Sequence, residues 1–233
     1  MKRIALPFAM FVIGLCVSDA SALTISRVPI RCPIGGEMFT TDLAMSGTQM
    51  GQNLDRRPVG AIASPWPLPK CPKNGFVVFK KAFTPAEIRT LEPFVRSAQY
   101  QALQKTESDY FLASRLMTEL RAPRHEIASA LLRATWEVEN DPRYPRYAER
   151  ALAAIEALLA DGSALQRDDV ASYRQIAGEL ERRLGRFDAA RARFIALRGA
   201  PGVKGTPLER IVLQELELIR RRDTATHLAN AGD

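Results

Sequence analysis

Beyond Phe83 the apolar residues of this chain recur at intervals of three and four, which is the spacing of amphipathic helices. Three such faces are Ile127, Leu131, Ala134 and Val138; Tyr147, Ala151, Ile155 and Leu158; and Leu208, Val212, Leu216 and Ile219. Proline and glycine breakers separate these faces, which predicts about seven helices of roughly ten to eighteen residues. Because the connections are short, residues 84–233 are expected to form a domain of antiparallel helical hairpins that ends in a short disordered tail.

Two helix starts carry a recognisable N-terminal signal. Thr84-Pro85-Ala86-Glu87 and Thr206-Pro207-Leu208-Glu209 each combine an N-cap threonine, a proline at the first helical position and a glutamate three residues after the cap. This is the pattern of a capping box, in which the threonine and glutamate side chains satisfy two backbone N–H groups. The sequence therefore predicts a helix starting at each of these sites.

Residues 23–83 follow a different pattern. Short apolar runs, among them Val28, Ile30, Leu43 and the run from Phe76 to Phe79, are flanked by glycine, proline and serine, which favours short strands. Residues 45–69 contain three glycines and four prolines and are expected to form a long loop rather than a sheet. The N-terminal part is thus predicted to be a small β-rich ribbon module, which makes the fold mainly α with a small β region.

One predicted hairpin has a more specific signature. Gly178, Gly185, Phe187, Ala190 and Phe194 have the spacing of a tetratricopeptide repeat. Small residues at 178 and 190 would allow two helices to cross closely, and the two phenylalanines would fill the space between them. A single repeat cannot bury its apolar face alone, so neighbouring hairpins are expected to stack on it.

Two fragments of the N-terminal region are nearly identical, Cys32-Pro33-Ile34-Gly35-Gly36 and Cys71-Pro72-Lys73-Asn74-Gly75. Each resembles half of a zinc ribbon, Cys-Pro-x-Cys-Gly, with Gly35 or Asn74 in place of the second cysteine. A site for four thiolates is thereby reduced to two.

With these fragments, the chain resembles a bacterial family of uncharacterised proteins that have an N-terminal Cys-Pro-x-Cys-Gly ribbon pair and a C-terminal tetratricopeptide-like helical region. The matching stretches are residues 31–39, 71–76 and 178–187. The resemblance implies a metal-binding ribbon followed by a repeat scaffold. Because this chain departs from the pattern at positions 35 and 74, zinc binding is not carried over to it.

The two remaining cysteines favour a disulfide over a metal site. Zinc takes about four ligands, and the ribbon region has no histidine, so Glu37 or Asp42 would have to complete a site with Cys32 and Cys71. If the chain is exported, as its first residues indicate below, a disulfide is the simpler interpretation. Closing a loop of about forty residues would stabilise the fold by roughly 4 kcal/mol. The wide spacing differs from that of redox-active Cys-x-x-Cys pairs. We therefore expect a structural disulfide, with no metal and no cofactor.

The first residues are typical of a secretory signal. Lys2 and Arg3 precede an apolar run, and Ala20-Ser21-Ala22 forms a small-residue cleavage site, so residues 1–22 are expected to be removed. An uncleaved anchor is the alternative, but the run of about fourteen residues is shorter than the twenty that span a bilayer. Lipidation at Cys16 is disfavoured because Leu15 is not a small residue. The sequence predicts a periplasmic or secreted protein without an integral membrane span.

The chain is moderately basic. Its formal net charge is +7, and removal of residues 1–22 would take away two basic and one acidic side chain, leaving +6. Export argues against nucleic acid as the partner. An acidic protein, anionic lipid or cell-wall polymer fits such a charge, although scattered arginine is also an ordinary solvated surface.

The motifs of common enzymes are missing. There is no Gly-x-Ser-x-Gly, no His-Glu-x-x-His and no glycine-rich phosphate loop. His125-Glu126 is typical of a solvated first helical turn, and Glu137 and Glu139 would point to different sides of a helix. We therefore expect a non-enzymatic protein. The alternative is an envelope enzyme, hydrolytic or redox, with a site where the long loop meets the helices.

The expected function is that of a scaffold or adaptor that binds a protein or peptide through its helical surface. Stacked hairpins form a curved scaffold whose inner surface takes up partners, and here residues 124–140 and 168–184 would line it. Arg133 and Arg174 are the predicted partner-binding residues, and their charge favours an acidic partner. A purely structural envelope component held by charge is a further alternative.

Overall fold

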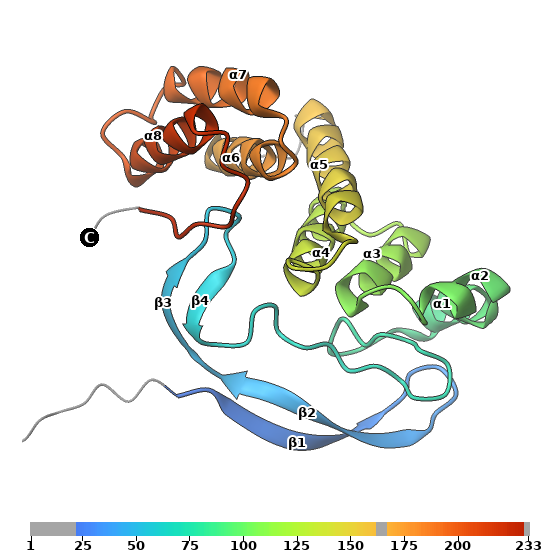
Figure 1. The fold of residues 1–233 in the computed structure, drawn as a ribbon. Coiled ribbons are helices and arrows are strands. Elements are labelled where there is room, and N and C mark those ends of the chain that lie inside the picture. Colours follow the sequence, from blue (N-terminus) through green and yellow to red (C-terminus); the bar gives the residue numbers. More distant parts are fainter. Residues whose placement is uncertain (1–21, 162–166, 231–233) are drawn as a thin grey trace, which may run out of the picture.

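The computed structural model describes residues 22–161 and 167–230, and within them four strands are followed by eight helices (Figure 1). The strands are β1 (Thr24–Arg31), β2 (Met38–Ser46), β3 (Thr48–Gln52) and β4 (Pro58–Ala61). The helices are α1 (Pro85–Arg96), α2 (Ala98–Leu103), α3 (Asp109–Glu119), α4 (Arg124–Glu137), α5 (Tyr144–Asp161), α6 (Arg167–Arg183), α7 (Phe187–Arg198) and α8 (Pro207–Arg220). This confirms the predicted mainly α fold with a small N-terminal β region. The expected signal segment lies outside the described residues, apart from Ala22.

The helices from α3 onward pack against their neighbours in chain order, and Figure 1 shows them following one another in an arc. The predicted face of α5, from Tyr147 to Leu158, is buried throughout. The face of α4 differs from the prediction, because Ile127 and Leu131 are only half-buried. Ala128 and Leu132 are buried in the core instead. Ala134 is buried as predicted.

The two predicted helix starts behave differently. At α1 the capping box forms: Thr84 Oγ1 accepts from the N–H of Glu87, whose carboxylate accepts from the N–H of Thr84. At α8 the helix starts after Thr206 as predicted, but the capping box is absent. Thr206 Oγ1 donates to the carbonyl oxygen of Val203, and Glu209 accepts from the N–H of Gly205. The left-handed φ of 78° at Gly205 brings the chain into this different turn.

Each β-sheet has two strands. β1 and β2 form an antiparallel hairpin in which Ile30 lies opposite Phe39 and Val28 opposite Thr41. β3 and β4 form a second antiparallel hairpin, so the prediction of a loop over residues 45–69 is wrong for this part. Pro58 stands at the first position of β4, where its missing N–H is tolerated. The run from Phe76 to Phe79 is not a strand and makes only a single bridge, between Val77 and Lys70.

The α6–α7 hairpin has the close crossing that its small residues indicate. A Cβ atom added at Gly178 would come within 2.6 Å of the Phe194 ring, and Ala190 and Phe194 are fully buried. Gly185 adopts a φ of 72° at the turn between the helices, a conformation that glycine adopts readily. The residues therefore pack as the spacing predicts for this one hairpin. Membership of a repeat family stays a prediction.

The β region and the helices share their cores. Both cysteines, Ile34, Phe76 and Val77 are buried in one cluster with residues of α1, α2 and α3. Further along, Leu68 packs against the cluster of α3 to α6, and Leu54 is buried against Ile211 and Leu218 of α8. The N-terminal part thus lacks a separate core of its own, and residues 53–80 run lengthwise along the helices.

The C-terminal tail is ordered as far as Asn230, although the sequence predicts disorder at this end. Leu228 bridges to Asn53 in antiparallel fashion, the N–H of Leu54 donates to the carbonyl oxygen of His227 at 2.9 Å, and that of Ala229 donates to the carbonyl oxygen of Gln52 at 2.8 Å. The tail therefore lies beside the end of β3. The last three residues lie outside the described part.

Candidate functional site

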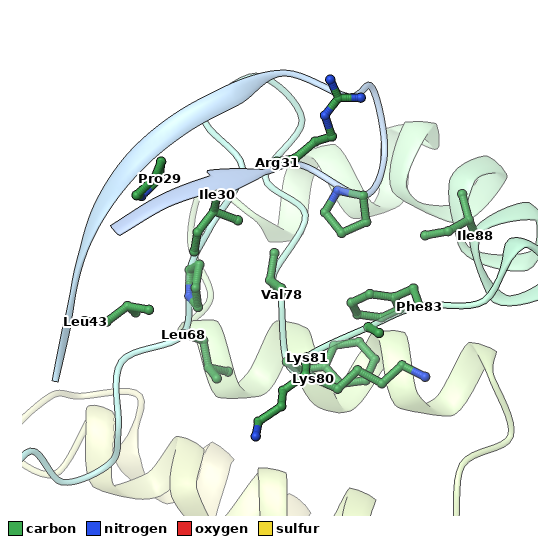
Figure 2. A pocket seen from close by; sticks show the side chains of 14 residues that line it. Pro29, Ile30, Arg31, Leu43, Leu68, Val78, Lys80, Lys81, Phe83 and Ile88 are labelled. Atoms are coloured by element: carbon green, nitrogen blue, oxygen red, sulfur yellow. The ribbon is translucent and has the colours of Figure 1, made fainter. Parts of the chain in front are cut away.

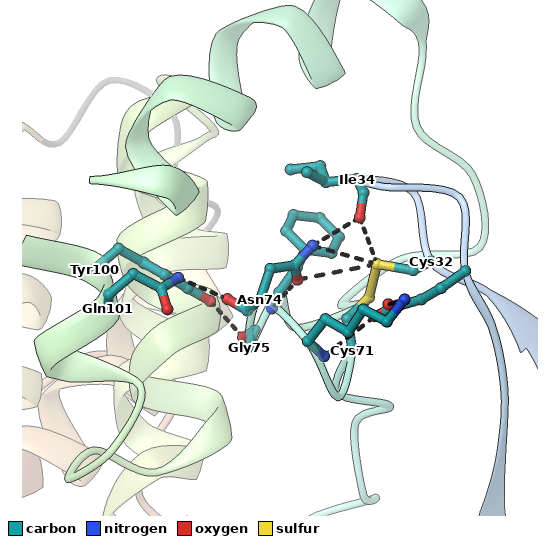
Figure 3. Close-up of a disulfide and its surroundings, with 10 residues drawn as sticks. Cys32, Ile34, Cys71, Asn74, Gly75, Tyr100 and Gln101 are labelled. Carbon is teal, nitrogen blue, oxygen red and sulfur yellow. Dashed lines mark hydrogen bonds and ion pairs between the residues drawn. A yellow bond between two sulfur atoms is a disulfide. The ribbon is translucent and has the colours of Figure 1, made fainter. Parts of the chain in front are cut away.

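The two cysteine fragments form matching turns, called here the knuckles (residues 32–37 and 71–76). In each knuckle the cysteine N–H donates to the carbonyl oxygen five residues later at 2.8 Å, and a glycine N–H donates back to the cysteine carbonyl oxygen. A disulfide joins Cys32 to Cys71, whose Cα atoms lie 5.7 Å apart (Figure 3). The predicted disulfide is therefore present.

Gly35 and Asn74, at the positions where the ribbon pattern would have its second cysteines, lie where the two knuckles face each other. Asn74 Nδ2 donates to the carbonyl oxygen of Ile34 at 2.7 Å, and Asn74 Oδ1 accepts from the N–H of Phe76 at 2.9 Å. A Cβ atom at Gly35 would lie 3.7 Å from Asn74 Nδ2, in ordinary contact. The side chain of Asn74 thus connects the two knuckles beside the disulfide, on the side where the ribbon pattern places its second cysteines.

Helix α2 fixes the second knuckle from the other side. The Tyr100 hydroxyl donates to the carbonyl oxygen of Gly75 at 2.9 Å, and Gln101 Nε2 donates to that of Asn74 at 2.9 Å (Figure 3). Burial of the Tyr100 phenol raises its pKa, so this donor stays protonated. The knuckle pair is therefore attached rigidly to the helices.

The two carboxylates that would have to complete a metal site have other partners. Glu37 accepts from the N–H of Lys73 and forms an ion pair with its ammonium group, while Asp42 pairs with Arg27 on the exposed face of the first hairpin. In the described part of the chain, no three His, Cys, Asp or Glu side chains cluster in a way that suits a metal ion. The fragments therefore act as a covalent clamp at the base of the first hairpin.

The clamp holds the β1–β2 hairpin above an apolar cavity of about 730 Å³, called here the hairpin groove (Figure 2). Ile30 and Leu43 lie on the hairpin side, and Leu68 and Val78 lie on the opposite side. The alternation along β1 is the cause, because Val28 and Ile30 turn inward while Ile25 and Arg27 are exposed. The groove extends to Phe83 and to Ile88 of α1.

Basic side chains line the groove together with these apolar ones. Arg31 and Lys81 are exposed and form no ion pair among the described residues, whereas Lys80 pairs with Glu87 and lies 4.9 Å from the centre of the Phe83 ring. No acidic, histidine, serine or cysteine side chain lines the groove. Its mixture of apolar and basic side chains suits binding of an apolar segment with acidic flanks.

The predicted partner-binding residues lie on two helices. Arg133 of α4 and Arg174 of α6 are both exposed. Next to them, however, the helices face the chain's own N-terminal segment: Gln175 Nε2 donates to the carbonyl oxygen of Leu54 at 2.7 Å, and the Tyr110 hydroxyl of α3 donates to that of Trp66 at 2.9 Å. Part of the surface expected to take up a partner is thus covered by residues 53–66.

A buried charge cluster lies between α6 and α8, and no sequence pattern predicted it. Arg182 is fully buried, and its Nε lies 2.8 Å from Glu179 Oε2 and 3.0 Å from Glu215 Oε2. Its Nη atoms donate to the carbonyl oxygens of Asp223 and Ala225, which anchors the C-terminal tail. Burial raises the pKa of both carboxyl groups, that of Glu215 to about 7. In sequence these residues are indistinguishable from a solvated helix face.

The remaining residues singled out in the sequence do not form a site. His125 is exposed at the start of α4. Glu137 accepts from the N–H of Tyr110 at 3.0 Å, whereas Glu139 lies beyond the end of α4 and binds Arg57 and Thr226. The two glutamates therefore make separate contacts. The prediction that they lie on different sides of one helix is wrong, because α4 ends at Glu137.

Comparison with known proteins adds no assignment to this geometry. None of the family models matches the chain, and neither the curated proteins nor the solved structures contain a match. The resemblance to a ribbon-and-repeat family stays a prediction that rests on the three sequence stretches.

Proposed function

We propose that this protein is an exported, non-enzymatic adaptor that holds an extended segment of a partner protein in the hairpin groove. The observation that carries the proposal is the groove itself, an apolar cavity of about 730 Å³ beneath a two-stranded sheet. Cavities of this size and apolar character are where proteins bind ligands.

The sheet above the groove favours an extended occupant. Within the described residues no third strand pairs with β1 or β2, so both outer edges of the hairpin leave backbone groups open. An extended peptide can pair with such an edge through its main chain and place alternate side chains in a neighbouring pocket. Arg31 and Lys81 would attract acidic residues that flank the apolar segment.

Export is part of the proposal, and two observations agree with it. The Cys32–Cys71 disulfide is typical of proteins that fold in an oxidising compartment. None of the helices in residues 22–161 and 167–230 is both long and apolar enough to cross a bilayer. The periplasm or the medium is thus the proposed location.

Site-specific crosslinking tests the groove. A photoreactive residue at Ile30 faces the groove, while the same residue at Ile25 on the same strand faces solvent and serves as the matched control. We expect crosslinking in the envelope to give a defined adduct with one partner peptide from position 30 only. Equal adducts from both positions, or none from position 30, would contradict the proposal.

The exposure of Arg133 and Arg174 supports a second docking surface for an acidic partner on the helices. Charge reversal at both positions should then weaken partner binding, and so should added salt, because salt screens attraction between exposed charges. Binding that ignores both changes would remove the helical surface from the proposal. Turnover of an envelope substrate by the purified protein would replace the adaptor with the enzyme alternative.

A further inference from the structure

A smaller cavity lies where the segment after β3 crosses helix α4. It has a volume of about 360 Å³ and is called here the tryptophan cavity. Its lining residues are Arg56, Pro58, Ala63, Ser64, Pro65, Trp66, Ser129, Leu132, Arg133 and Trp136. Two arginines and two tryptophans thus line one small space, and no acidic residue is among the ten.

Arg56 is held at this cavity by an unusual backbone. Its φ of 68° lies in the left-handed region, which is strained for a residue with a Cβ atom. Its Nε donates to Gln175 Oε1 at 2.8 Å, and Gln175 is itself fully buried and fixed by its bond to Leu54. The orientation of the Arg56 guanidinium is therefore set by a neutral amide.

The charge of Arg56 is not balanced in the described part of the chain. It forms no ion pair there, and partial burial lowers the pKa of its guanidinium because the charged form loses hydration. The neighbouring carboxylates are engaged elsewhere: Asp55 accepts from the N–H of Arg57, and Glu139 pairs with Arg57. A partly buried cation without a counterion favours the binding of an anion beside it.

Arg133 reaches the same cavity from α4. Its guanidinium carbon lies 5.8 Å from the centre of the Tyr110 ring, and it has no ion pair among the described residues. The two arginines are thus the lining residues whose charge no acidic partner balances in the described part of the chain. Trp66 and Trp136 add flat apolar surface beside them.

We infer that the tryptophan cavity binds a small organic carboxylate with an aromatic or similarly flat apolar body. Arginine pairs with carboxylates through charge-assisted, often bidentate hydrogen bonds. The apolar body would lie among Trp66, Trp136 and Leu132, since ligand sites combine apolar walls with a few polar groups that fix orientation. This site is separate from the hairpin groove and does not depend on its occupant, although it shares Arg133 with the second docking surface proposed above.

The chain itself provides the assay. It contains two tryptophans, and both line this cavity, so intrinsic tryptophan fluorescence responds to a ligand that binds there. Trp136 also borders a second cavity next to Glu139, and the arginine variants below distinguish the two places. We use 3-phenylpropionate as the probe, with the neutral 3-phenylpropanamide and inorganic phosphate as comparisons. Saturable fluorescence change with the carboxylate, confirmed by calorimetry, and at least tenfold weaker binding of the amide and of phosphate are expected. Equal affinity for the amide, equal affinity for phosphate, or no saturable binding would overturn the inference.

Variants assign the binding to the two arginines. Arg133→Gln removes one exposed charge from the cavity, and Arg56→Asn removes the other while keeping a residue that tolerates a left-handed backbone. Each should weaken 3-phenylpropionate binding about tenfold, whereas Arg89→Gln, at an exposed arginine of α1, should leave it unchanged. Undiminished binding in Arg133→Gln would overturn the inference even if Arg56→Asn failed to fold.

Discussion

The side-chain amide of Asn74 donates a hydrogen bond of 2.7 Å to the carbonyl oxygen of Ile34, across the space between the two knuckles. In a zinc ribbon a metal ion would connect two such turns through four ligands. Here the amide and the disulfide provide the connection, one by a hydrogen bond and the other covalently. The two turns have the same pattern of backbone hydrogen bonds.

Removing the disulfide should destabilise the protein strongly. Cys32→Ser opens a loop with a sequence separation of 39 residues, which lowers the free energy of unfolding by about 4 kcal/mol in the chain-entropy model. Chemical denaturation of the purified protein with and without reductant measures this difference. Before reduction neither Cys32 nor Cys71 should react with an alkylating reagent, and rapid alkylation of both would contradict the structure.

Asn74→Ala should destabilise the knuckle pair by about 1–3 kcal/mol. The substitution leaves the carbonyl oxygen of Ile34 and the N–H of buried Phe76 without their partner, and unsatisfied buried groups carry that cost. Lys73→Ala is the matched control, because its ion pair with Glu37 is exposed on the lysine side and is worth at most about 1 kcal/mol. Equal melting temperatures of the two variants would refute the bridging role.

The buried glutamates predict that stability falls as pH rises above about 5. The pKa of Glu215 is raised from 4.5 in the unfolded chain to about 7 in the fold, so the folded state binds more protons between these values. Stability therefore decreases through this window, by an amount on the order of 3 kcal/mol. Glu215→Gln should flatten the decrease measured by denaturation at pH 5 and pH 8.

Glu217→Gln serves as the control for this experiment. Glu217 lies exposed on the same helix, and its side-chain hydrogen bond with Arg220 lowers its pKa, so it is ionised throughout the window. Its removal should leave the pH dependence intact. An unchanged slope in Glu215→Gln would show that the buried carboxyl does not titrate as the structure requires.

Gly178→Ala should cost about 1–3 kcal/mol, because the added Cβ atom would meet the Phe194 ring at 2.6 Å and overpack the α6–α7 crossing. Gly199→Ala makes the same chemical change at the end of α7, where the nearest atom would be 3.6 Å away and φ is −79°. Thermal melting should separate the two variants. Similar melting temperatures would mean that α6 and α7 cross less closely.

The helices were predictable where local chemistry sets them, as at the capping box of Thr84. At Thr206 the helix starts as predicted, but the capping box does not form, because Gly205 takes a left-handed conformation and donates its own N–H to Glu209. The hairpin of β3 and β4 was not predicted, because its glycines and Pro58 are typical of loops. Leu228, which bridges to Asn53 directly after β3, lies far away in sequence. Pairing of this kind leaves no local periodicity to read.

The candidate sites were less predictable than the fold. The disulfide followed from counting cysteines. The hairpin groove, in contrast, is lined by Ile30 and Val78, which lie far apart in sequence, so no local pattern predicts it. Arg133 was selected for its place on a helix, whereas its closeness to Trp66 arises from the path of residues 56–66. Buried Arg182 lies among charged neighbours in sequence, where nothing marks it as interior.

The hydrogen bonds between the C-terminal tail and the end of β3 can form only late in the synthesis of the chain. A ribosome releases the chain from its N-terminus, so Gln52 and Leu54 emerge long before Ala229 and His227, which provide their last backbone partners. Until residues 227–229 appear, the backbone groups of Gln52 and Leu54 that bond them stay open to other chains, a state that favours aggregation. A nascent chain that stalls between residues 221 and 226 would therefore expose these backbone groups even though helices α1 to α8 had already been synthesised.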